Sequence, residues 1–184
     1  REMQSWPEGV EFETLDPMMR ITLNTILRAV FGAKGDELDE LRVVIPAAVE
    51  FGSKIALLPS LVRKDLGAWS PGGKFAQYRR RMDEICTSLI ADARSDPNFA
   101  DRGDVLSLLL QARYDNGEPL PDSYIIDELL TMLVAGHETT SNMLALATLA
   151  LLRHPDQLAA VRDNPAAVAP AVEELLRWLS IVHA

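Results

Sequence analysis

The sequence predicts a mainly α-helical protein, and three observations lead to this fold class. Apolar residues recur at intervals of three and four along most of the 184 residues, which is the spacing of amphipathic helices. Glycine, proline and Asp-Asn turn signals divide these stretches into segments of helical length. The strict apolar–polar alternation of half-buried strands is nearly absent. We therefore expect helices joined by loops, with little or no sheet.

Three helices are predicted in the first half of the chain. The first closes at Gly32, the second covers 37–57 and the third covers 74–94, and a loop rich in proline and glycine over 59–73 separates the last two. Each helix has one apolar face that we expect to point inward. These faces comprise Met18, Ile21, Thr22, Ile26, Leu27, Val30 and Phe31; Leu38, Leu41, Val44, Ile45, Ala48 and Val49; and Met82, Ile85, Cys86, Leu89 and Ile90.

Four further helices are predicted in the second half. The first begins near Asp104 and stops at an Asp-Asn-Gly turn. The second is the longest, running from 122 to about 153, and His154-Pro155 ends it because proline cannot continue the hydrogen-bond ladder. The last two cover 157–162 and 167–179. No internal repeat or linker between domains is visible, so we expect one domain over 1–184.

Composition and charge narrow the class of protein. A hydrophobic content of 48% with 24% charged residues is ordinary for a globular protein. The net charge of -9 argues against a nucleic-acid binder, which would carry a basic face. The single cysteine, Cys86, excludes a disulfide framework or a cysteine-rich zinc site. No secretory signal and no membrane segment is recognised, so we expect a cytoplasmic protein.

A polar segment interrupts the longest apolar stretch of the chain. Residues 135–141, hereafter the polar turn, read Ala-Gly-His-Glu-Thr-Thr-Ser. A helix that is apolar on nearly all sides is a buried helix, and burying unpaired polar groups is costly, so chemistry is the favoured reason for this segment. Gly136 lets a ligand approach the backbone, and Thr139 and Thr140 can bond to carbonyls four residues back. We expect a locally widened helix beside a small ligand.

Glu138 is the sharpest clue in the polar turn. A carboxylate in an apolar helix must find a partner, raise its pKa or reach water, and these are conditions in which an acid can relay protons. The alternative is a polar kink that caps a cavity or meets a buried arginine. Metal sites fail, because the second histidine of H-E-x-x-H and the histidine of a di-iron Glu-x-x-His pair would both fall at Ser141. We therefore expect no metal ligand set in this chain.

Two motifs carry a resemblance to a known family. Residues 135–140, Ala-Gly-His-Glu-Thr-Thr, resemble the A-G-x-(D/E)-T-(T/S) signature on the central helix of cytochrome P450 monooxygenases. Downstream, Glu174-Leu175-Leu176-Arg177 contains the family's E-x-x-R pair in the expected segment. The break at His154-Pro155 also resembles the family's pattern, and the helices at 37–57 and 74–94 resemble the pair that flexes over the substrate. The resemblance implies a partial P450 fold built around the long central helix.

The resemblance implies roles for individual residues. Glu138 and Thr139 match the catalytic acid–alcohol pair that delivers protons during dioxygen activation, and Ala135 and Gly136 match the groove where dioxygen sits. Three residues would face the substrate or the haem edge: Thr131, Val134 and Val182, the last beside His183. Glu174 and Arg177 match a buried structural ion pair that supports the loop carrying the haem ligand.

The haem ligand itself is not recognised in this chain. P450 iron is bound by a cysteine thiolate in a glycine-containing loop after E-x-x-R, which would lie beyond residue 184. Cys86 has no Phe-x-x-Gly lead-in, and a buried small hydrophobic role fits it better. We therefore expect a single partial domain truncated at both ends, inactive by itself, whose parent enzyme binds haem b.

The resemblance implies a haem-thiolate monooxygenase as the parent. It would insert one oxygen atom from dioxygen into a small apolar substrate, with electrons from a separate redox partner such as a ferredoxin. An alternative from another class is a helical small-molecule-binding or regulatory domain. That alternative calls for a basic patch or a helix-turn-helix, and the sequence offers neither.

Overall fold

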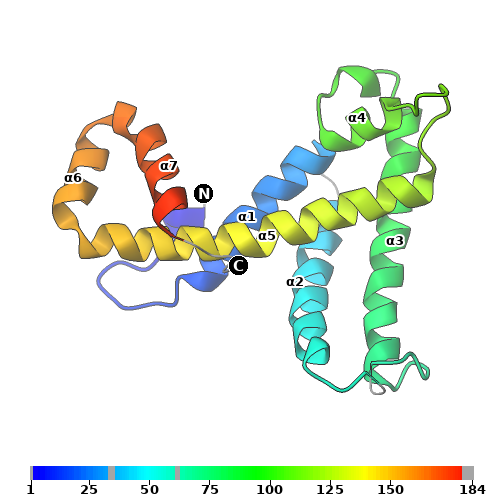
Figure 1. The fold of residues 1–184 in the computed structure, drawn as a ribbon, viewed down its shortest axis with the longest axis horizontal. Coiled ribbons are helices and arrows are strands. Elements are labelled where there is room, and N and C mark those ends of the chain that lie inside the picture. Colours follow the sequence, from blue (N-terminus) through cyan, green and yellow to red (C-terminus); the bar gives the residue numbers. More distant parts are fainter. Residues whose placement is uncertain (1, 33–35, 61–62, 180–184) are drawn as a thin grey trace. The chain divides into compact units, whose positions relative to one another are not determined.

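The protein is almost entirely helical. The computed structural model describes residues 2–32, 36–60 and 63–179. Figure 1 shows helices joined by loops. Within these ranges the only β structure is an isolated antiparallel bridge between Arg113 and Pro119, which closes the turn at Gly117. The predicted mainly α fold class is confirmed.

The described ranges contain seven α-helices and three short 3-10 helices, which are labelled in chain order. They are η1 (Glu2–Ser5), α1 (Leu15–Phe31), α2 (Asp36–Ala56), α3 (Pro71–Ser95), η2 (Phe99–Asp101), α4 (Val105–Gln111), α5 (Asp122–Arg153), α6 (Pro155–Asp163), η3 (Pro165–Ala167) and α7 (Val168–Trp178).

Each predicted helix is present, and its ends agree with the prediction to within a few residues. The end of α4 differs most, because the helix ends at Gln111 rather than at the Asp115-Asn116-Gly117 turn. The start of α3 also differs, because the helix begins at Pro71 rather than at residue 74. The Ser70 hydroxyl caps this end by accepting the backbone N–H of Gly73 at 3.0 Å, and Pro71 occupies the first helical position, where its missing N–H costs nothing. A serine followed by proline was therefore the start signal that the sequence prediction overlooked.

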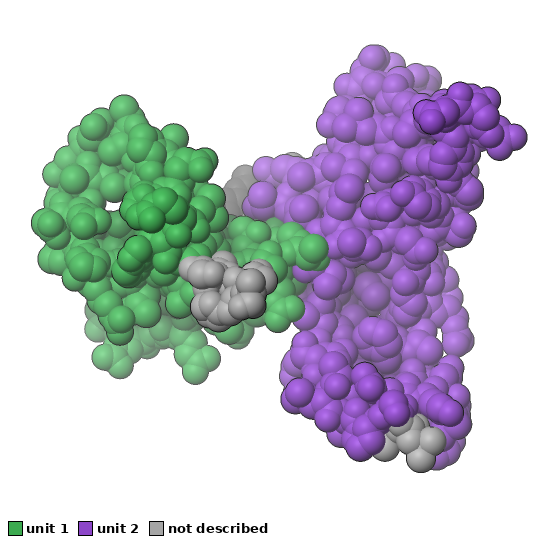
Figure 2. Space-filling view, in the orientation of Figure 1, with its two compact units in different colours: residues 1–23, 135–184 green, residues 24–134 purple. Residues whose placement is uncertain are grey.

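The chain divides into two compact units (Figure 2). Unit 1 comprises residues 1–23 and 135–184, and unit 2 comprises residues 24–134. The division falls inside α1 and inside α5, so that each of these helices contributes residues to both units. The expected single domain over 1–184 stays a prediction.

Unit 2 is built around the packing of α2 on α3, to which α4 is added. Most residues of the predicted inward faces of α2 and α3 are buried, Leu41, Ile45, Met82 and Ile85 among them. Val44, Val49 and Leu89 are only partly buried. Cys86 lies in the same core and is fully buried, as expected of a small hydrophobic residue. Burial of these faces supplies the main stabilisation of the unit, because each large side chain removed from water contributes about 1.5–3 kcal/mol.

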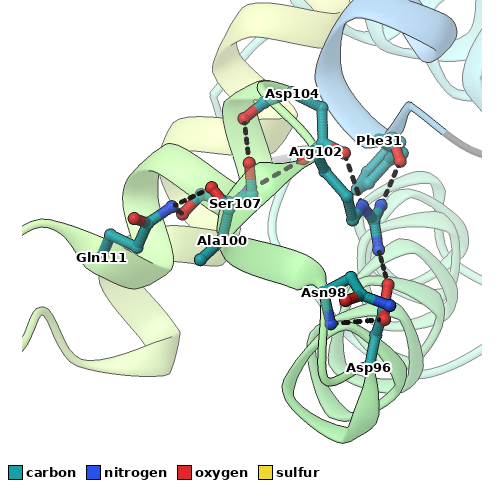
Figure 3. Close-up of polar contacts among 8 residues, drawn as sticks. All are labelled: Phe31, Asp96, Asn98, Ala100, Arg102, Asp104, Ser107 and Gln111. Atoms are coloured by element: carbon teal, nitrogen blue, oxygen red, sulfur yellow. Dashed lines mark hydrogen bonds and ion pairs between the residues drawn. The ribbon is translucent and has the colours of Figure 1, made fainter.

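A half-buried ion pair joins the start of α4 to the end of α1 within unit 2 (Figure 3). The Asp104 carboxylate caps α4 by accepting the Ser107 N–H at 2.8 Å and also accepts Arg102 Nε at 2.8 Å. The same guanidinium donates to the carbonyl of Phe31, the last residue of α1. Gly32 follows at φ +65°, and a Cβ there would lie 2.5 Å from the Asp104 carboxylate. Glycine is therefore required on both conformational and steric grounds.

Unit 1 contains the second half of α5 together with α6, η3 and α7. As predicted, His154-Pro155 ends α5, and Pro155 is the first residue of α6. Both α6 and α7 pack on η3, and a hollow of about 290 Å³ lies between them and the end of α5, lined by residues that include Leu151, Val161 and Leu175. Among the helices in the described ranges, none is long and apolar enough to cross a membrane.

Candidate functional site

The polar turn lies on α5, which remains α-helical through all seven residues. The expected local widening of the helix is therefore wrong: the hydroxyls of this segment bond to backbone carbonyls without interrupting the helix. Thr139 Oγ1 donates to the carbonyl of Ala135 at 2.6 Å, as predicted. Ser141 Oγ donates to the carbonyl of Glu138 at 2.8 Å. The corresponding bond from Thr140 is not formed among the described residues.

Packing separates the polar turn into two sets of residues. Ala135, Glu138 and Thr139 are exposed, whereas His137 and Ser141 are buried. Each set follows the three- and four-residue spacing of one helix face. The acid and the alcohol predicted to act in catalysis therefore share a surface, beside the small Ala135. The Glu138 side chain is open to solvent and meets no buried arginine among the described residues.

His137 is held by Thr22 of α1, and both residues belong to unit 1. Thr22 Oγ1 lies 3.1 Å from His137 Nδ1 and 3.2 Å from the backbone carbonyl of His137. His137 has no exposed surface, and its Nε2 has no hydrogen-bond partner among the described residues. Burial lowers the pKa of His137, and the nearby Glu138 carboxylate opposes this only in part. The imidazole is therefore neutral at neutral pH.

The predicted substrate-facing residues differ in what can be said of them. Thr131 and Val134 are both exposed on α5, the latter at the end of unit 2. Their roles stay predictions, because exposure alone does not identify a substrate. Val182 and His183 lie outside the described residues.

Glu174 and Arg177 form the predicted ion pair on α7. Arg177 donates through Nε to Glu174 Oε2 at 2.7 Å and through a terminal nitrogen to Oε1. The hydrogen bond from Arg177 lowers the pKa of Glu174. Both side chains are more than half exposed, so the buried environment that the resemblance implied is not supplied by the described residues. An exposed pair of this kind adds little to stability.

Cys86 is the sole cysteine of the chain, and its environment does not fit a haem ligand. It is fully buried in unit 2, and burial raises the pKa of its thiol to about 12. A thiolate is what binds iron in a haem-thiolate centre, and this thiol stays protonated. Cys86 is therefore unsuited to be the axial thiolate ligand of a haem.

Sequence reasoning missed Thr22 as part of this site. The residue was assigned to the inward face of the first helix as if it were apolar, although its hydroxyl needs a partner once it is buried. The missed signal was a polar residue on an otherwise apolar face, in a chain that has a second polar anomaly at His137. Only the fold brings the two together, because they are 115 positions apart.

The fold and the site together define a mainly helical protein whose longest helix presents an acid and an alcohol beside a small-residue segment. The family model described as "Cytochrome P450" matches residues 1–175. The chain belongs to the cytochrome P450 family, whose members are haem monooxygenases. Membership favours an enzyme over a helical regulatory domain.

Named relatives agree with this assignment. Cytochrome P450 138 of Mycobacterium tuberculosis is 53% identical over 164 residues, which make up 89% of this chain and 37% of that protein. Cytochrome P450 135B1 of the same species is 40% identical over 181 residues, or 93% of this chain and 37% of the relative. The chain thus spans little more than a third of the length of these relatives.

Solved structures are similar over most of the chain. The heme domain of cytochrome P450DA has a TM-score of 0.69 at 27% identity and covers 87% of this chain and 35% of its own. A retinoic acid-bound cyanobacterial protein, CYP120A1, has a TM-score of 0.73 at 23% identity, covering 91% and 36%. The second likeness concerns the fold alone.

Proposed function

We propose that this chain forms the oxygen-activating, substrate-facing part of a haem-thiolate monooxygenase. The reaction inserts one atom of dioxygen into a small, largely apolar organic substrate. The single observation that carries the proposal is the exposed surface of α5, where Glu138 and Thr139 adjoin Ala135. This surface lies on the segment that matches the family signature.

The groups of this surface suit proton delivery to a reacting oxygen. Thr139 Oγ1 donates to the carbonyl of Ala135, which fixes the hydroxyl and leaves its lone pairs free to accept a hydrogen bond from water. Glu138 is exposed and makes no ion pair with the described residues, so its carboxylate is accessible to solvent. The two side chains together would carry protons from water to the reaction site.

Haem would lie along this same surface. Ala135 and Gly136 would lie against it, since neither carries a side chain long enough to hold a planar group away from the helix. When bound, haem iron supplies the reductive activation of dioxygen. The thiolate ligand would come from a residue other than Cys86.

The residues that flank this surface suggest the kind of substrate, and the family suggests the kind of electron donor. Thr131 and Val134 would contact a substrate that is mainly apolar. The Thr131 hydroxyl, which donates to the Asp127 carbonyl at 2.7 Å, would accept a hydrogen bond from such a substrate. Glu174 and Arg177 would support the loop that holds the haem ligand. Electrons would come from a separate protein of the ferredoxin type.

The proposal predicts that Thr139→Ala uncouples reductant consumption from product formation. In the haem-loaded enzyme, we expect product per reductant consumed to fall about tenfold, because the fixed hydroxyl is lost; proton transfer by a positioned group contributes about 10²–10⁴ in rate. Thr139→Ser is the matched control, since it keeps a hydroxyl within reach of the Ala135 carbonyl and should retain most of the coupling. Equal coupling in Thr139→Ala and the unaltered enzyme would refute the proposed role.

A further inference from the structure

The contact between Thr22 and His137 is the most fully buried polar interaction near the proposed relay. Thr22 is 4% exposed and His137 is 0% exposed. The hydroxyl touches both the ring nitrogen Nδ1 and the backbone carbonyl of His137. One threonine on α1 therefore holds a side chain and a main-chain atom of the same α5 residue.

The hydrogen positions can be assigned by counting the bonds that each arrangement makes. Thr22 has a single O–H, within reach of His137 Nδ1, of the His137 carbonyl and of the Met19 carbonyl at 3.1 Å. If the O–H points at Nδ1, only one bond forms. If the O–H donates to a carbonyl and Nδ1–H donates to Oγ1, two bonds form, so this second arrangement is preferred. In this arrangement the imidazole donates its Nδ1–H to Thr22 Oγ1, and Nε2 has no hydrogen-bond partner among the described residues.

The held residue is the immediate neighbour of the proposed relay. His137 precedes Glu138 by one position and Thr139 by two, and its carbonyl is the helical acceptor for the Ser141 amide. An extra hydrogen bond to this carbonyl, together with the bond to Nδ1, fixes the turn against α1. A rotation or shift of this turn would move the Thr139 hydroxyl, and small misplacements of a reacting group cost large factors in rate.

We propose that Thr22 and the Nδ1 edge of His137 form a clamp that positions the polar turn, with His137 as a positioning residue rather than a catalytic one. The inference rests on the proposed function, because it assigns the clamp a role in placing Glu138 and Thr139. It also makes a distinction that the family signature does not make, namely that one ring nitrogen of His137 matters and the other does not.

Four variants test the clamp in matched pairs. Thr22→Val removes the hydroxyl at nearly constant shape, and Thr22→Ser keeps it. His137→Asn places an amide atom near the position of Nδ1, whereas His137→Gln places one near the position of Nε2. The clamp predicts that Thr22→Val and His137→Gln lose protection of the Ser141 amide and coupling of the reaction. Thr22→Ser and His137→Asn should keep both close to the values of the unaltered protein.

Two readouts are needed. Hydrogen exchange of the Ser141 amide, measured on this chain without haem, should accelerate about tenfold in the two impaired variants, the ratio expected when a buried hydrogen bond is lost. In the haem-loaded enzyme, the same two variants should yield about two- to fivefold less product per reductant consumed, with substrate affinity changing less than coupling. A purely structural contact would change exchange and leave coupling unaltered.

The outcomes separate the clamp from the proposed function. Unchanged exchange and coupling in Thr22→Val refute the clamp, as does a rescue by His137→Gln in place of His137→Asn. Unchanged coupling in Thr22→Val, with Thr139→Ala still uncoupled, refutes the positioning role alone. Unchanged coupling in both Thr22→Val and Thr139→Ala refutes the proposed function, and with it the positioning role of the clamp.

Discussion

Replacing Arg102 with methionine tests how strongly the ion pair in Figure 3 holds unit 2 together. Arg102 is 24% exposed and Asp104 only 3%, so Asp104 has lost nearly all of its water. Arg102→Met leaves this buried carboxylate with the Ser107 amide as its remaining donor. It also removes the guanidinium from the carbonyl of Phe31.

The expected loss lies between two measured limits. Breaking a fully buried pair costs about 3–5 kcal/mol, and breaking an exposed one costs about 0–1 kcal/mol. Because Arg102 retains part of its solvent, we expect Arg102→Met to lower the free energy of unfolding by about 2 kcal/mol. Asp104→Ala should cost about 1 kcal/mol more than Asp104→Ser, because serine still caps α4.

Urea titration followed by circular dichroism measures these differences, with the slope compared among variants. A double-mutant cycle of Arg102→Met and Asp104→Ser should give a coupling of about 1–2 kcal/mol. Arg162→Met is the matched control, since Arg162 and Asp163 form an exposed pair and its loss should cost under about 0.5 kcal/mol. A coupling below about 0.3 kcal/mol, or an equal loss in the control, would refute the reasoning.

Three further predictions follow from single features of the structure. Gly32→Ala should lower the free energy of unfolding in urea titration by about 2–3 kcal/mol, because it combines a left-handed conformation with a Cβ pressed against Asp104; the loss should shrink in Asp104→Ser. Cys86 should resist iodoacetamide until the chain unfolds, and haem added to this chain should give no thiolate-type carbon monoxide difference band, since the pKa of its thiol is raised to about 12. The pKa of His137 is lowered on folding, so the unfolded chain binds more protons than the folded chain below about pH 6.5. The free energy of unfolding should therefore decrease as the pH is lowered through this range, by up to about 1.4 kcal/mol per pH unit. His137→Asn should lack this dependence in urea titrations between pH 5 and pH 7, roughly the range in which a histidine titrates; an identical pH profile would contradict the assignment.

The helices could be predicted from the sequence because their signals are local. A three- and four-residue apolar period, a glycine after α1 and a proline after α5 each act within a few positions, so the ends of α1 and α5 match the prediction closely. The polar turn could also be singled out from the sequence, since a carboxylate inside an apolar helix is anomalous wherever the helix lies; its chemical role stays a prediction.

What the sequence could not give was the direction of each polar side chain. His137 and Glu138 are adjacent in sequence and equally anomalous in an apolar stretch, yet one is fully buried and the other exposed. The choice depends on Thr22, and likewise the role of Arg102 depends on the carbonyl of Phe31, 71 positions away. Long-range partners of this kind follow from packing, which a local pattern does not encode.

The division of the polar turn has a consequence for how this helix can change over time. Substitutions at His137 and Ser141 act on folding, and therefore on how much protein a cell retains. Substitutions at the exposed Glu138 and Thr139 leave the core untouched, and under the proposed function they act on the reaction. Neighbouring codons are thus exposed to different selective pressures. The buried face of α5 is constrained first by folding and, through the proposed clamp, by the position of the exposed face, whereas the exposed face is free of the folding constraint.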